Sequence, residues 1–372
     1  MHRTYTTQLK VTRKQDENLH RLLAQLCELY NMALQQKRDI WKSHRICISR
    51  YEQQKQLTEL RGAIEEYAEF PATIQRDPLR RLDRAFNAFF RRMKNGDKAG
   101  FPRFRNQQRY DSFSVNYQNF RLCLDKISIT RLGSFKIKTR CKIRGTPLEL
   151  RVMRCGNKWQ AQIVCDIGPA PDKASVCNTV GIDMGLTALV TLSDGTEIAN
   201  PHWTKQEEDR LANANRSLGS KRKGSNNRRK SKERLRRVHQ NIAGKRRFYL
   251  HRISHQLIET YDLIAYEDLK IAEMAQSRFG KGILDAAWGE LIHQLKYKAE
   301  CAGKYAVAVD PRGTTQMCSG CGEKVPKGLK QRAHNCPHCG LSLGRDHNAA
   351  LNVLRLGESL VGKTQNTLFV NA

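Results

Sequence analysis

Two pairs of cysteines near the C-terminus constrain this chain more than any other feature. Cys318-Ser-Gly-Cys321 is followed, after fourteen residues, by Cys336-Pro-His-Cys339. Four thiolates at this spacing complete a tetrahedral site for Zn²⁺ and leave no position open for water. The spacing therefore predicts a zinc ribbon in which Cys318, Cys321, Cys336 and Cys339 bind one structural zinc ion.

The charge of the chain points to a polyanionic partner. Its 372 residues include 66 Lys and Arg but only 36 Asp and Glu, so the formal net charge is +30. Nucleic acid is the first candidate for such a protein, and a merely soluble basic protein is the alternative. We expect no membrane partner, because no apolar run is long enough to span a bilayer, and no signal peptide follows Met1. The remaining cysteines are scattered, which is typical of a reducing compartment.

The first half of the chain predicts a sheet interrupted by helices. Residues 3–12 are expected to form a strand, and a helical pattern of apolar residues begins at Gln15. Short alternating runs between residues 98 and 166 predict an antiparallel sheet, which we expect to form a small β-barrel. The initial strand could close that barrel. On this interpretation residues 1–13 and 98–170 form the barrel domain, and residues 14–97 are a helical insertion.

The second half follows an α/β pattern, so the whole chain is expected to be a multidomain α+β protein. A Pro-rich segment at residues 168–173 is a predicted linker. Beyond it we expect an RNase H-like α/β nuclease domain over residues 171–313 and 343–356, interrupted by the zinc ribbon at residues 314–342. Residues 357–372 show little pattern and are expected to be disordered.

Three carboxylates are placed as two-metal hydrolysis requires. Asp183 and Glu267 each end a predicted strand, and Asp346 begins the last predicted helix. Hydrolysis of a phosphodiester by two Mg²⁺ ions needs carboxylates that converge from separate elements. The order of the three predicts a catalytic magnesium site formed by Asp183, Glu267 and Asp346.

Each carboxylate taken alone is weaker evidence, because an Asp at a strand end is more often a cap or turn residue. Asp194, Asp268 and Asp310 are rivals, with Asp310 the strongest of them because it also ends a strand. Gly181 and Gly185 flank Asp183, and small residues there are expected to permit close approach of a phosphate.

Two basic segments are candidate nucleic-acid contacts. Fifteen Lys or Arg and a single acidic residue lie between Arg216 and Arg252. With so few acids to pair them, we favour a helix that follows phosphates over a solvated helix. The second segment is a turn whose aromatic residues either stack on bases or anchor the core. The candidate contacts are Lys221, Arg222, Arg229, Arg236 and Arg237 in the first segment and Phe101, Arg103, Phe104 and Arg105 in the second.

Over nearly its whole length the chain resembles the TnpB family of transposon-encoded RNA-guided nucleases, which is related to type V CRISPR effectors. The resemblance is most specific in four motifs, and Gly100-Phe-Pro-Arg-Phe and the helical insertion are also similar. The four are Val180-Gly-Ile-Asp-Met-Gly-Leu, Ala265-Tyr-Glu-Asp-Leu, Asp310-Pro-Arg-Gly-Thr-Thr-Gln-Met-Cys-Ser-Gly-Cys-Gly and Arg345-Asp-His-Asn-Ala-Ala-Leu-Asn-Val. Two positions depart from the family pattern: Gly313 replaces an aromatic residue, and Gly344 replaces Asp or Cys.

The resemblance implies a RuvC-like domain with Asp183, Glu267 and Asp346 as its catalytic residues and with no catalytic role for Asp310. It implies a wedge-like barrel that holds a noncoding guide RNA and reads a short motif beside the target. Double-stranded DNA, with its displaced single strand, would be the substrate in a prokaryotic cytoplasm and nucleoid, with sequence read by guide pairing. A non-cleaving RNA- or DNA-binding regulator and a strand-transferring transposase remain alternatives.

Overall fold

The structure is a computed structural model that describes residues 1–138, 142–156, 158–328 and 331–370, with side chains as far as residue 362. The chain divides into two compact units, Met1–Pro169 and Ala170–Ala372. The division falls in the segment where the sequence analysis expects a linker. In the described part of the chain, no helix is both long and apolar enough to cross a membrane.

The first unit contains a seven-stranded antiparallel sheet with strand order β2-β6-β7-β1-β5-β4-β3. Its strands are β1 (His2–Lys10), β2 (Ser112–Asn116), β3 (Phe120–Leu122), β4 (Lys126–Ile129), β5 (Gly133–Lys138), β6 (Thr146–Cys155) and β7 (Lys158–Asp166). The first strand lies between β7 and β5, so the N-terminus completes the sheet. Among the described residues no pairing joins the edge strands β2 and β3, and closure into a barrel stays a prediction.

Helices fill the interval between β1 and β2, together with the 3-10 turn η1 (Gln107–Arg109), and a second 3-10 turn, η2 (Tyr117–Asn119), joins β2 to β3. The helices are α1 (Arg13–His44), α2 (Arg50–Ala63), α3 (Glu65–Ala68) and α4 (Ala72–Lys94). Thr12 begins α1 through a capping box with Gln15. The indole N–H of Trp159 on β7 donates to Asp16 on α1 at 2.6 Å. Helices and sheet share one hydrophobic cluster, so this unit has a single core.

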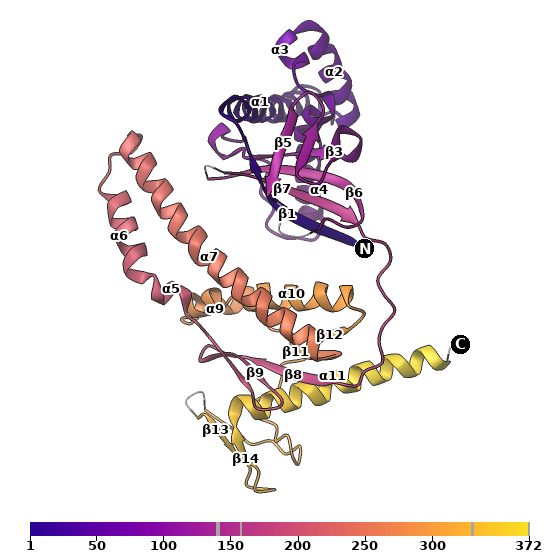
Figure 1. Ribbon diagram of the computed structural model, residues 1–372, viewed down its shortest axis with the longest axis vertical. Coiled ribbons are helices and arrows are strands. Elements are labelled where there is room, and N and C mark those ends of the chain that lie inside the picture. Colours follow the sequence, from indigo (N-terminus) through magenta and orange to yellow (C-terminus); the bar gives the residue numbers. More distant parts are fainter. Residues whose placement is uncertain (139–141, 157, 329–330, 371–372) are drawn as a thin grey trace. The chain divides into compact units, whose positions relative to one another are not determined.

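The second unit is built on a five-stranded mixed sheet with strand order β10-β9-β8-β11-β12. Its strands are β8 (Thr179–Met184), β9 (Ala188–Leu192), β10 (Glu197–Ala199), β11 (Leu263–Glu267) and β12 (Tyr305–Val309). The first three strands in this order pair antiparallel, whereas β8, β11 and β12 run parallel. As Figure 1 shows, helices α7 and α10 cover one face and α11 crosses the other.

The helices of the second unit include a long hairpin, α6–α7, and the C-terminal helix α11. Their bounds are α5 (Trp203–Gln206), α6 (Glu208–Gly219), α7 (Asn226–Thr260), α8 (Ile271–Met274), α9 (Gly280–Ala286), α10 (Trp288–Cys301) and α11 (Arg345–Val370). A two-stranded sheet of β13 (Ala333–Asn335) and β14 (Ser342–Gly344) leads into α11.

The expectation of disorder from residue 357 is wrong for the helical part of that segment. Helix α11 continues to Val370, and the side chain of Val361 is buried. A Cβ added to Gly357 would lie 2.4 Å from the Cβ of Ala265 on β11. The segment shows little pattern because a glycine at 357 lets the helix backbone lie directly on the sheet. Residues 371–372 lie outside the described residues.

Candidate functional site

A close contact between β8 and α11 sets the direction of Asp183. A Cβ on Gly181 would lie only 2.1 Å from the carbonyl oxygen of Ala350, so β8 packs on the backbone of α11. Side chains alternate along a strand, and Asp183 therefore points to the same face as Gly181. The interpretation of Gly181 as a residue that permits phosphate approach is thus wrong, because its missing side chain makes room for α11.

Glu267 reaches the same face from the neighbouring strand. Tyr266 pairs in parallel register with Ile182, which places Glu267 beside Asp183 one residue further on. Ala265 faces Gly357 of α11, and Glu267 follows two residues later on that side. Asp346 lies in the first turn of α11, one turn before Ala350. The structure thus brings Asp183, Glu267 and Asp346 together from three elements.

The electrostatics of the site reflect this crowding. Burial, followed by the charges of Glu267 and Asp346, raises the pKa of Asp183 to about 8, and the nearby Arg345 opposes that rise. Burial also raises the pKa of Glu267. The hydroxyl of Thr314 donates to Glu267 and counters part of that shift. Three acidic groups therefore share a region in which negative charge is poorly accommodated.

Asp346 is positioned by two arginines. Its carboxylate accepts from Nε of Arg345 at 3.0 Å and lies 3.7 Å from a guanidinium nitrogen of Arg332. Arg332 precedes β13, so Asp346 is held partly by the segment that carries the cysteines. These ion pairs orient the third carboxylate at the helix start.

The carboxylates have the donor chemistry for Mg²⁺, which prefers oxygen ligands and bridges carboxylates and phosphates. Their repulsion, seen in the raised pKa of Asp183, is what a cation would relieve. Within the described ranges, the cysteines are the one group of three or more acidic, His or Cys side chains already close enough to hold an ion.

The rival aspartates serve local structure. Asp310 is exposed and accepts from the backbone N–H of Arg312 at 3.0 Å. Asp194 accepts from the backbone N–H of Thr196 at 2.8 Å and from the hydroxyl of Tyr261 at 3.0 Å. Asp268 is exposed. None of these rivals contributes to the shifted pKa of Asp183.

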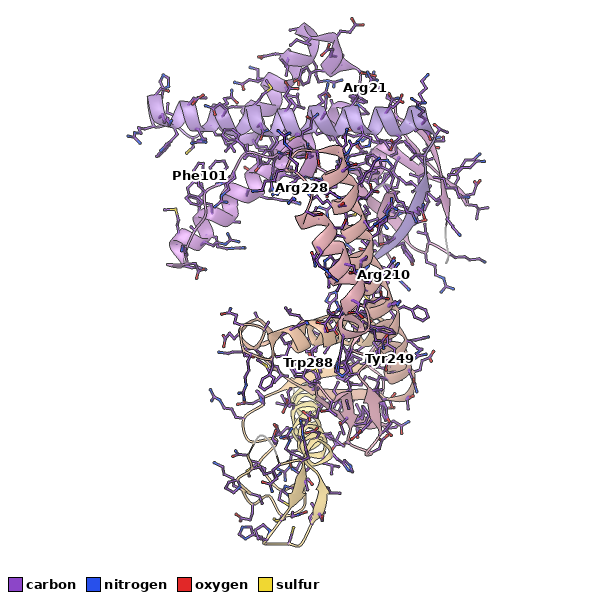
Figure 2. All side chains as sticks on the ribbon, turned by 90° about the vertical axis from the view of Figure 1, so that its left-hand side faces the viewer. Arg21, Phe101, Arg210, Arg228, Tyr249 and Trp288 are labelled. Carbon is purple, nitrogen blue, oxygen red and sulfur yellow. The ribbon has the colours of Figure 1, made fainter. Side chains whose placement is uncertain are left out.

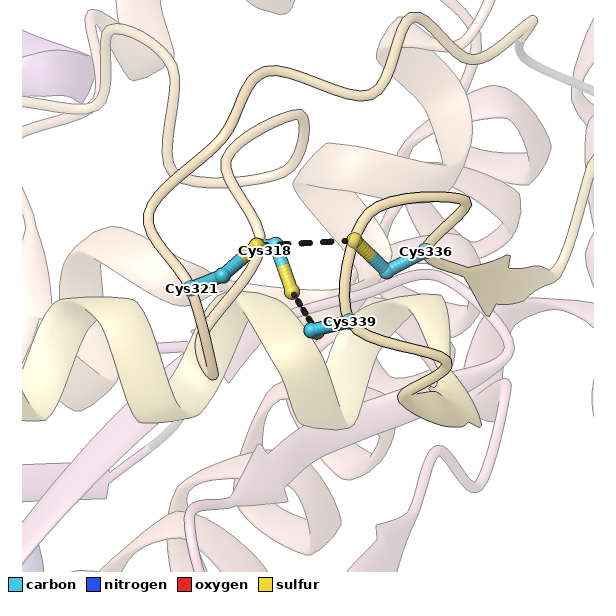
Figure 3. A group of neighbouring side chains, drawn as sticks. All are labelled: Cys318, Cys321, Cys336 and Cys339. Atoms are coloured by element: carbon cyan, nitrogen blue, oxygen red, sulfur yellow. Dashed lines mark hydrogen bonds between the residues drawn. The ribbon is translucent and has the colours of Figure 1, made fainter.

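The four cysteines form the cluster that their spacing predicts (Figure 3). Their sulfur atoms all lie within 4.8 Å of one another, with 3.7 Å between Cys318 and Cys339 and 3.5 Å between Cys321 and Cys336. Desolvation raises the pKa of Cys318, but backbone N–H donors of Cys321 and Gly320 and the ring of His334 outweigh it and lower that pKa to about 5. Four cysteine sulfurs this close together fit a tetrahedral Zn²⁺ ion.

Sequence reasoning missed three buried residues that join the cysteine cluster to the carboxylates. Asn348 on α11 accepts from the N–H of Ser319 at 2.9 Å and donates to Met317 O at 2.8 Å. Asn352, one turn later, donates to Met317 O at 2.7 Å and to Thr314 O at 2.9 Å. Thr314 in turn holds Glu267. Two asparagines spaced i,i+4 on an apolar helix face were the available signal.

The basic candidates of the second unit lie on the α6–α7 hairpin. Ala214, Val238 and Ile242 pack the two helices together, and Arg228 lies near the tip of the hairpin, far from Tyr249 at its base (Figure 2). Arg237 forms an ion pair with Glu233 at 2.9 Å. The candidates Lys221, Arg222, Arg229, Arg236 and Arg237 are all exposed. Their exposure is compatible with phosphate contacts.

The aromatic turn that carries Phe101 and Phe104 has features both of a core anchor and of a surface that can stack on bases. Phe101 packs edge-on against Phe86 and Phe89, yet Phe101 and Phe104 each remain 46% exposed. The guanidinium of Arg38 lies over both rings, 5.9 and 5.4 Å from their centroids. The turn is fixed to α1, because the backbone N–H of Arg105 donates to Asn31 at 2.8 Å. Arg103 and Arg105 are exposed.

Comparison with known proteins places the chain in a family. A family model described as "Probable transposase" matches residues 162–278, and one described as "Cas12f1-like, TNB domain" matches residues 288–353. A Streptomyces pristinaespiralis protein named "Putative RNA-guided DNA endonuclease" is 30% identical over 93% of this chain and 87% of its own length. The chain belongs to the TnpB family. A second relative, the Escherichia coli protein "Putative RNA-guided DNA endonuclease InsQ", is 29% identical over 78% of this chain and 76% of its own.

The fold of this TnpB family member has a solved counterpart. The cryo-EM structure of a Cas12f1–sgRNA–target DNA complex matches 92% of this chain and 83% of the solved chain, with a TM-score of 0.60 and 15% identity. At that identity the match establishes a shared mixed α/β multidomain fold. The arrangement of carboxylates, cysteines and basic helices described above is taken from the structure of this chain and not from the solved complex.

Proposed function

We propose that this TnpB family member is an RNA-guided endonuclease that cuts double-stranded DNA by Mg²⁺-dependent hydrolysis of a phosphodiester. The observation that carries the proposal is the convergence of Asp183, Glu267 and Asp346 from β8, β11 and α11, with the pKa of Asp183 raised by burial and by the other two. The names of the relatives over most of the chain's length support the same activity.

The sheet of the second unit supports an RNase H-like, RuvC-type nuclease domain. Three antiparallel strands continue into two parallel ones, and the first and fourth strands of the chain order, β8 and β11, carry neighbouring carboxylates at their ends. We assign residues 171–313 and 343–356 to this domain, with the zinc ribbon of residues 314–342 inserted, and α11 extends beyond residue 356 to Val370. Residues 1–13 and 98–170 would be the wedge-like domain and residues 14–97 the recognition insertion.

The protein groups have distinct parts in the proposed reaction. Mg²⁺, when bound by Asp183, Glu267 and Asp346, would stabilise the attacking and leaving oxygens of the phosphodiester. The hydroxyl of Thr314 keeps Glu267 oriented and favours its ionised form. Arg345 orients Asp346 through the contact at 3.0 Å. Bound Zn²⁺ would be structural, fixing the loop from which Thr314 and Met317 contact α11.

The partner is a noncoding guide RNA from the transposon, together with the target DNA. The net charge of +30 and the exposed arginines of the α6–α7 hairpin suit a large folded polyanion. Base pairing with the guide would then select the sequence, while the protein reads a short motif beside the target. The position of the cut would follow the guide and not the protein.

The test compares cleavage of one plasmid by protein carrying a matched, a mismatched or no guide RNA, with Asp183→Ala as the inactive control. The expected result is a cut with the matched guide alone, which moves when the guide segment is changed. Equal cutting in all three reactions would leave a nonspecific nuclease. Strand joining without release of a cut end would favour a transposase, and guide-directed binding without cutting would favour a regulator.

A further inference from the structure

A small aromatic and basic pocket lies at the base of the α6–α7 hairpin, outside the carboxylate site. Its volume is about 290 Å³, at the lower end of ligand pockets and suited to one flat ring system rather than a large ligand. The pocket is lined by Pro201, Trp203, Lys245, Phe248, Tyr249 and Arg252. Trp203 begins α5, Pro201 lies just before that helix, and the other four come from α7.

The side chains combine ring faces with positive charge. Trp203 and Tyr249 meet edge to face with ring centroids 6.3 Å apart. Lys245 lies 5.7 Å from the centroid of Trp203, and Arg252 lies 5.3 Å from that of Tyr249. Phe248 is 74% exposed, so most of its ring is accessible to a ligand at the pocket. Aromatic rings among cations are the features with which proteins stack an unpaired base and hold its phosphates.

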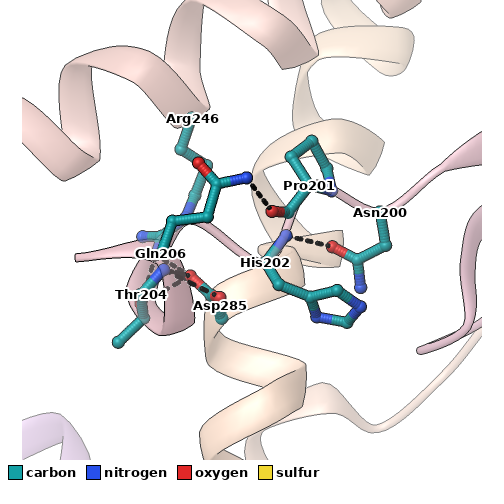
Figure 4. A network of polar contacts seen from close by, with 7 residues as sticks. All are labelled: Asn200, Pro201, His202, Thr204, Gln206, Arg246 and Asp285. Atoms are coloured by element: carbon teal, nitrogen blue, oxygen red, sulfur yellow. Dashed lines mark hydrogen bonds and ion pairs between the residues drawn. The ribbon is translucent and has the colours of Figure 1, made fainter. Parts of the chain in front are cut away.

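A buried polar network fixes the walls of this pocket (Figure 4). Asp285 on α9 accepts from the backbone N–H and the hydroxyl of Thr204, next to Trp203. It also accepts from Arg246, next to Lys245, at 2.5 Å. The hydroxyl of Tyr249 donates to Ala199 O on β10 at 2.7 Å. Both walls are therefore positioned before any ligand binds.

Strand register places the pocket at the same end of the sheet as the carboxylates. Ala199 at the end of β10 pairs with Ala188 at the start of β9, and β9 follows β8 through a tight turn. The side chain of Asn200 donates to Leu186 O in that turn at 2.9 Å, three residues after Asp183. A nucleic-acid strand that crosses the carboxyl end of β8 would therefore pass both the carboxylates and the pocket.

We propose that this pocket binds an unpaired nucleobase of the DNA strand that the carboxylates cut, holding that strand in register with the site. The assignment to DNA rests on the proposed function, because it follows from the position beside Asp183. The pocket's capacity for a nucleobase rests on its own chemistry. Fifteen basic residues between Arg216 and Arg252 provide the charge complement for the flanking phosphates.

The test measures binding of fluorescent oligo(dT) to the full-length protein purified with the RNA that it carries. Phe248→Ala removes an exposed ring and should not affect folding. It should weaken oligo(dT) binding roughly tenfold, as expected for the loss of one stacked base. The matched control is Phe279→Ala, which removes another exposed phenylalanine with an arginine over its ring, and it should bind as wild type does. An oligonucleotide of abasic residues should bind both variants equally.

Three results would overturn the proposal. An equal loss on the abasic probe would show that Phe248 acts on the backbone contacts and not on a base. Unchanged oligo(dT) binding with weaker retention of the protein's own RNA would assign the pocket to RNA. Unchanged nucleic-acid binding with a lower Tm would make Phe248 a packing residue. Guide-directed plasmid cleavage is scored separately, so failure of the proposed function is distinguishable from failure of the pocket.

Discussion

At the scale of single residues, Asp183 shows how the site stores unfavourable charge. Burial and two acidic neighbours raise its pKa to about 8, against 3.8 for an ordinary aspartate. Between those values the folded protein retains a proton that the unfolded chain has released. The contribution of Asp183 to the stability of the metal-free protein therefore falls as pH rises through this window. Magnesium binding must also displace that proton.

Replacing Asp183 by Asn should abolish cleavage and stabilise the metal-free protein. The amide cannot ionise, so above pH 8 the variant should melt about 2–4 °C above wild type. In the wild type, cleavage at limiting Mg²⁺ should rise from pH 6 to pH 8, and excess Mg²⁺ should shift that rise to lower pH. Thermal melts and cleavage rates against pH measure both effects. The exposed Asp310→Asn should change neither, and destabilisation by Asp183→Asn would refute the charge argument.

The sequence predicts the three carboxylates of the proposed site but not the residues that contact them. Asp183 and Glu267 end apolar runs, and Asp346 begins a helix, so their positions follow from local patterns. Thr314 acts only because the segment after β12 meets the end of β11, and that meeting is a tertiary contact. The roles of Asn348 and Asn352 depend in the same way on tertiary contacts, with Ser319 and Thr314 respectively.

At the scale of elements, the packing of β8 on α11 assembles the site. Because a Cβ on Gly181 would meet Ala350 O at 2.1 Å and Leu354 N at 2.5 Å, any side chain must push the helix away. Asp346 begins that helix, so its carboxylate would move away from Asp183. A change remote from the three carboxylates should thus disturb the geometry of the proposed metal site.

Gly181→Ala should reduce cleavage at least tenfold and destabilise the protein by about 1–3 kcal/mol, the range for overpacked cores. Gly219→Ala on α6 is the control, because no atom lies within 4 Å of the added Cβ. It should be neutral or slightly stabilising, since Ala favours helix over Gly. Urea denaturation and plasmid cleavage measure the pair. Equal behaviour of the two variants would contradict the role given to this contact.

The segment that carries the four cysteines is a second element on which the proposed site depends. One Zn²⁺ per chain should be found by metal analysis, and its removal should unfold the ribbon, because metal binding supplies the folding energy of such sites. Thr314 would then lose its anchor on Asn352, and cleavage should fall with the metal. Cys321→Ser should reproduce this loss, whereas Cys301→Ser, another exposed cysteine, should not. Active protein without zinc would refute the prediction.

Element boundaries show where local patterns fail. An Asp followed by Pro is typical of a helix start, yet Asp77 and Pro78 lie inside α4, which begins at Ala72. Asp77 is buried and accepts from the N–H of Ser114 on β2 at 3.2 Å, with Arg81 2.8 Å away. A residue that resembles a cap here forms an ion pair within α4 and accepts a hydrogen bond from the sheet. Helix propensity and capping rules consider only residues close in sequence, so they cannot predict a contact between Asp77 and Ser114.

At the scale of the whole molecule, composition predicts the partner better than it predicts the fold. An excess of thirty positive charges points to nucleic acid whatever the topology. The division of the chain near residue 170 can also be predicted from the sequence, because a Pro-rich segment separates the antiparallel pattern of the first half from the α/β pattern of the second. Closure of the first sheet into a barrel cannot be predicted from the sequence, since it depends on whether the edge strands β2 and β3 meet.

The exposed arginines of α7 should therefore contribute to affinity through counterion release. Replacing Arg229 and Arg236 together by Gln removes two proposed phosphate contacts, and for single strands each such contact contributes about 0.7 to the slope of log affinity against log salt. The slope for a single-stranded RNA probe should fall by about 1.4. The control, Lys270→Gln with Lys281→Gln, removes the same charge from side chains already paired with Glu273 and Glu208. Salt titrations of RNA binding measure both variants, and an equal fall in slope would mean that net charge, rather than the α6–α7 hairpin, governs binding.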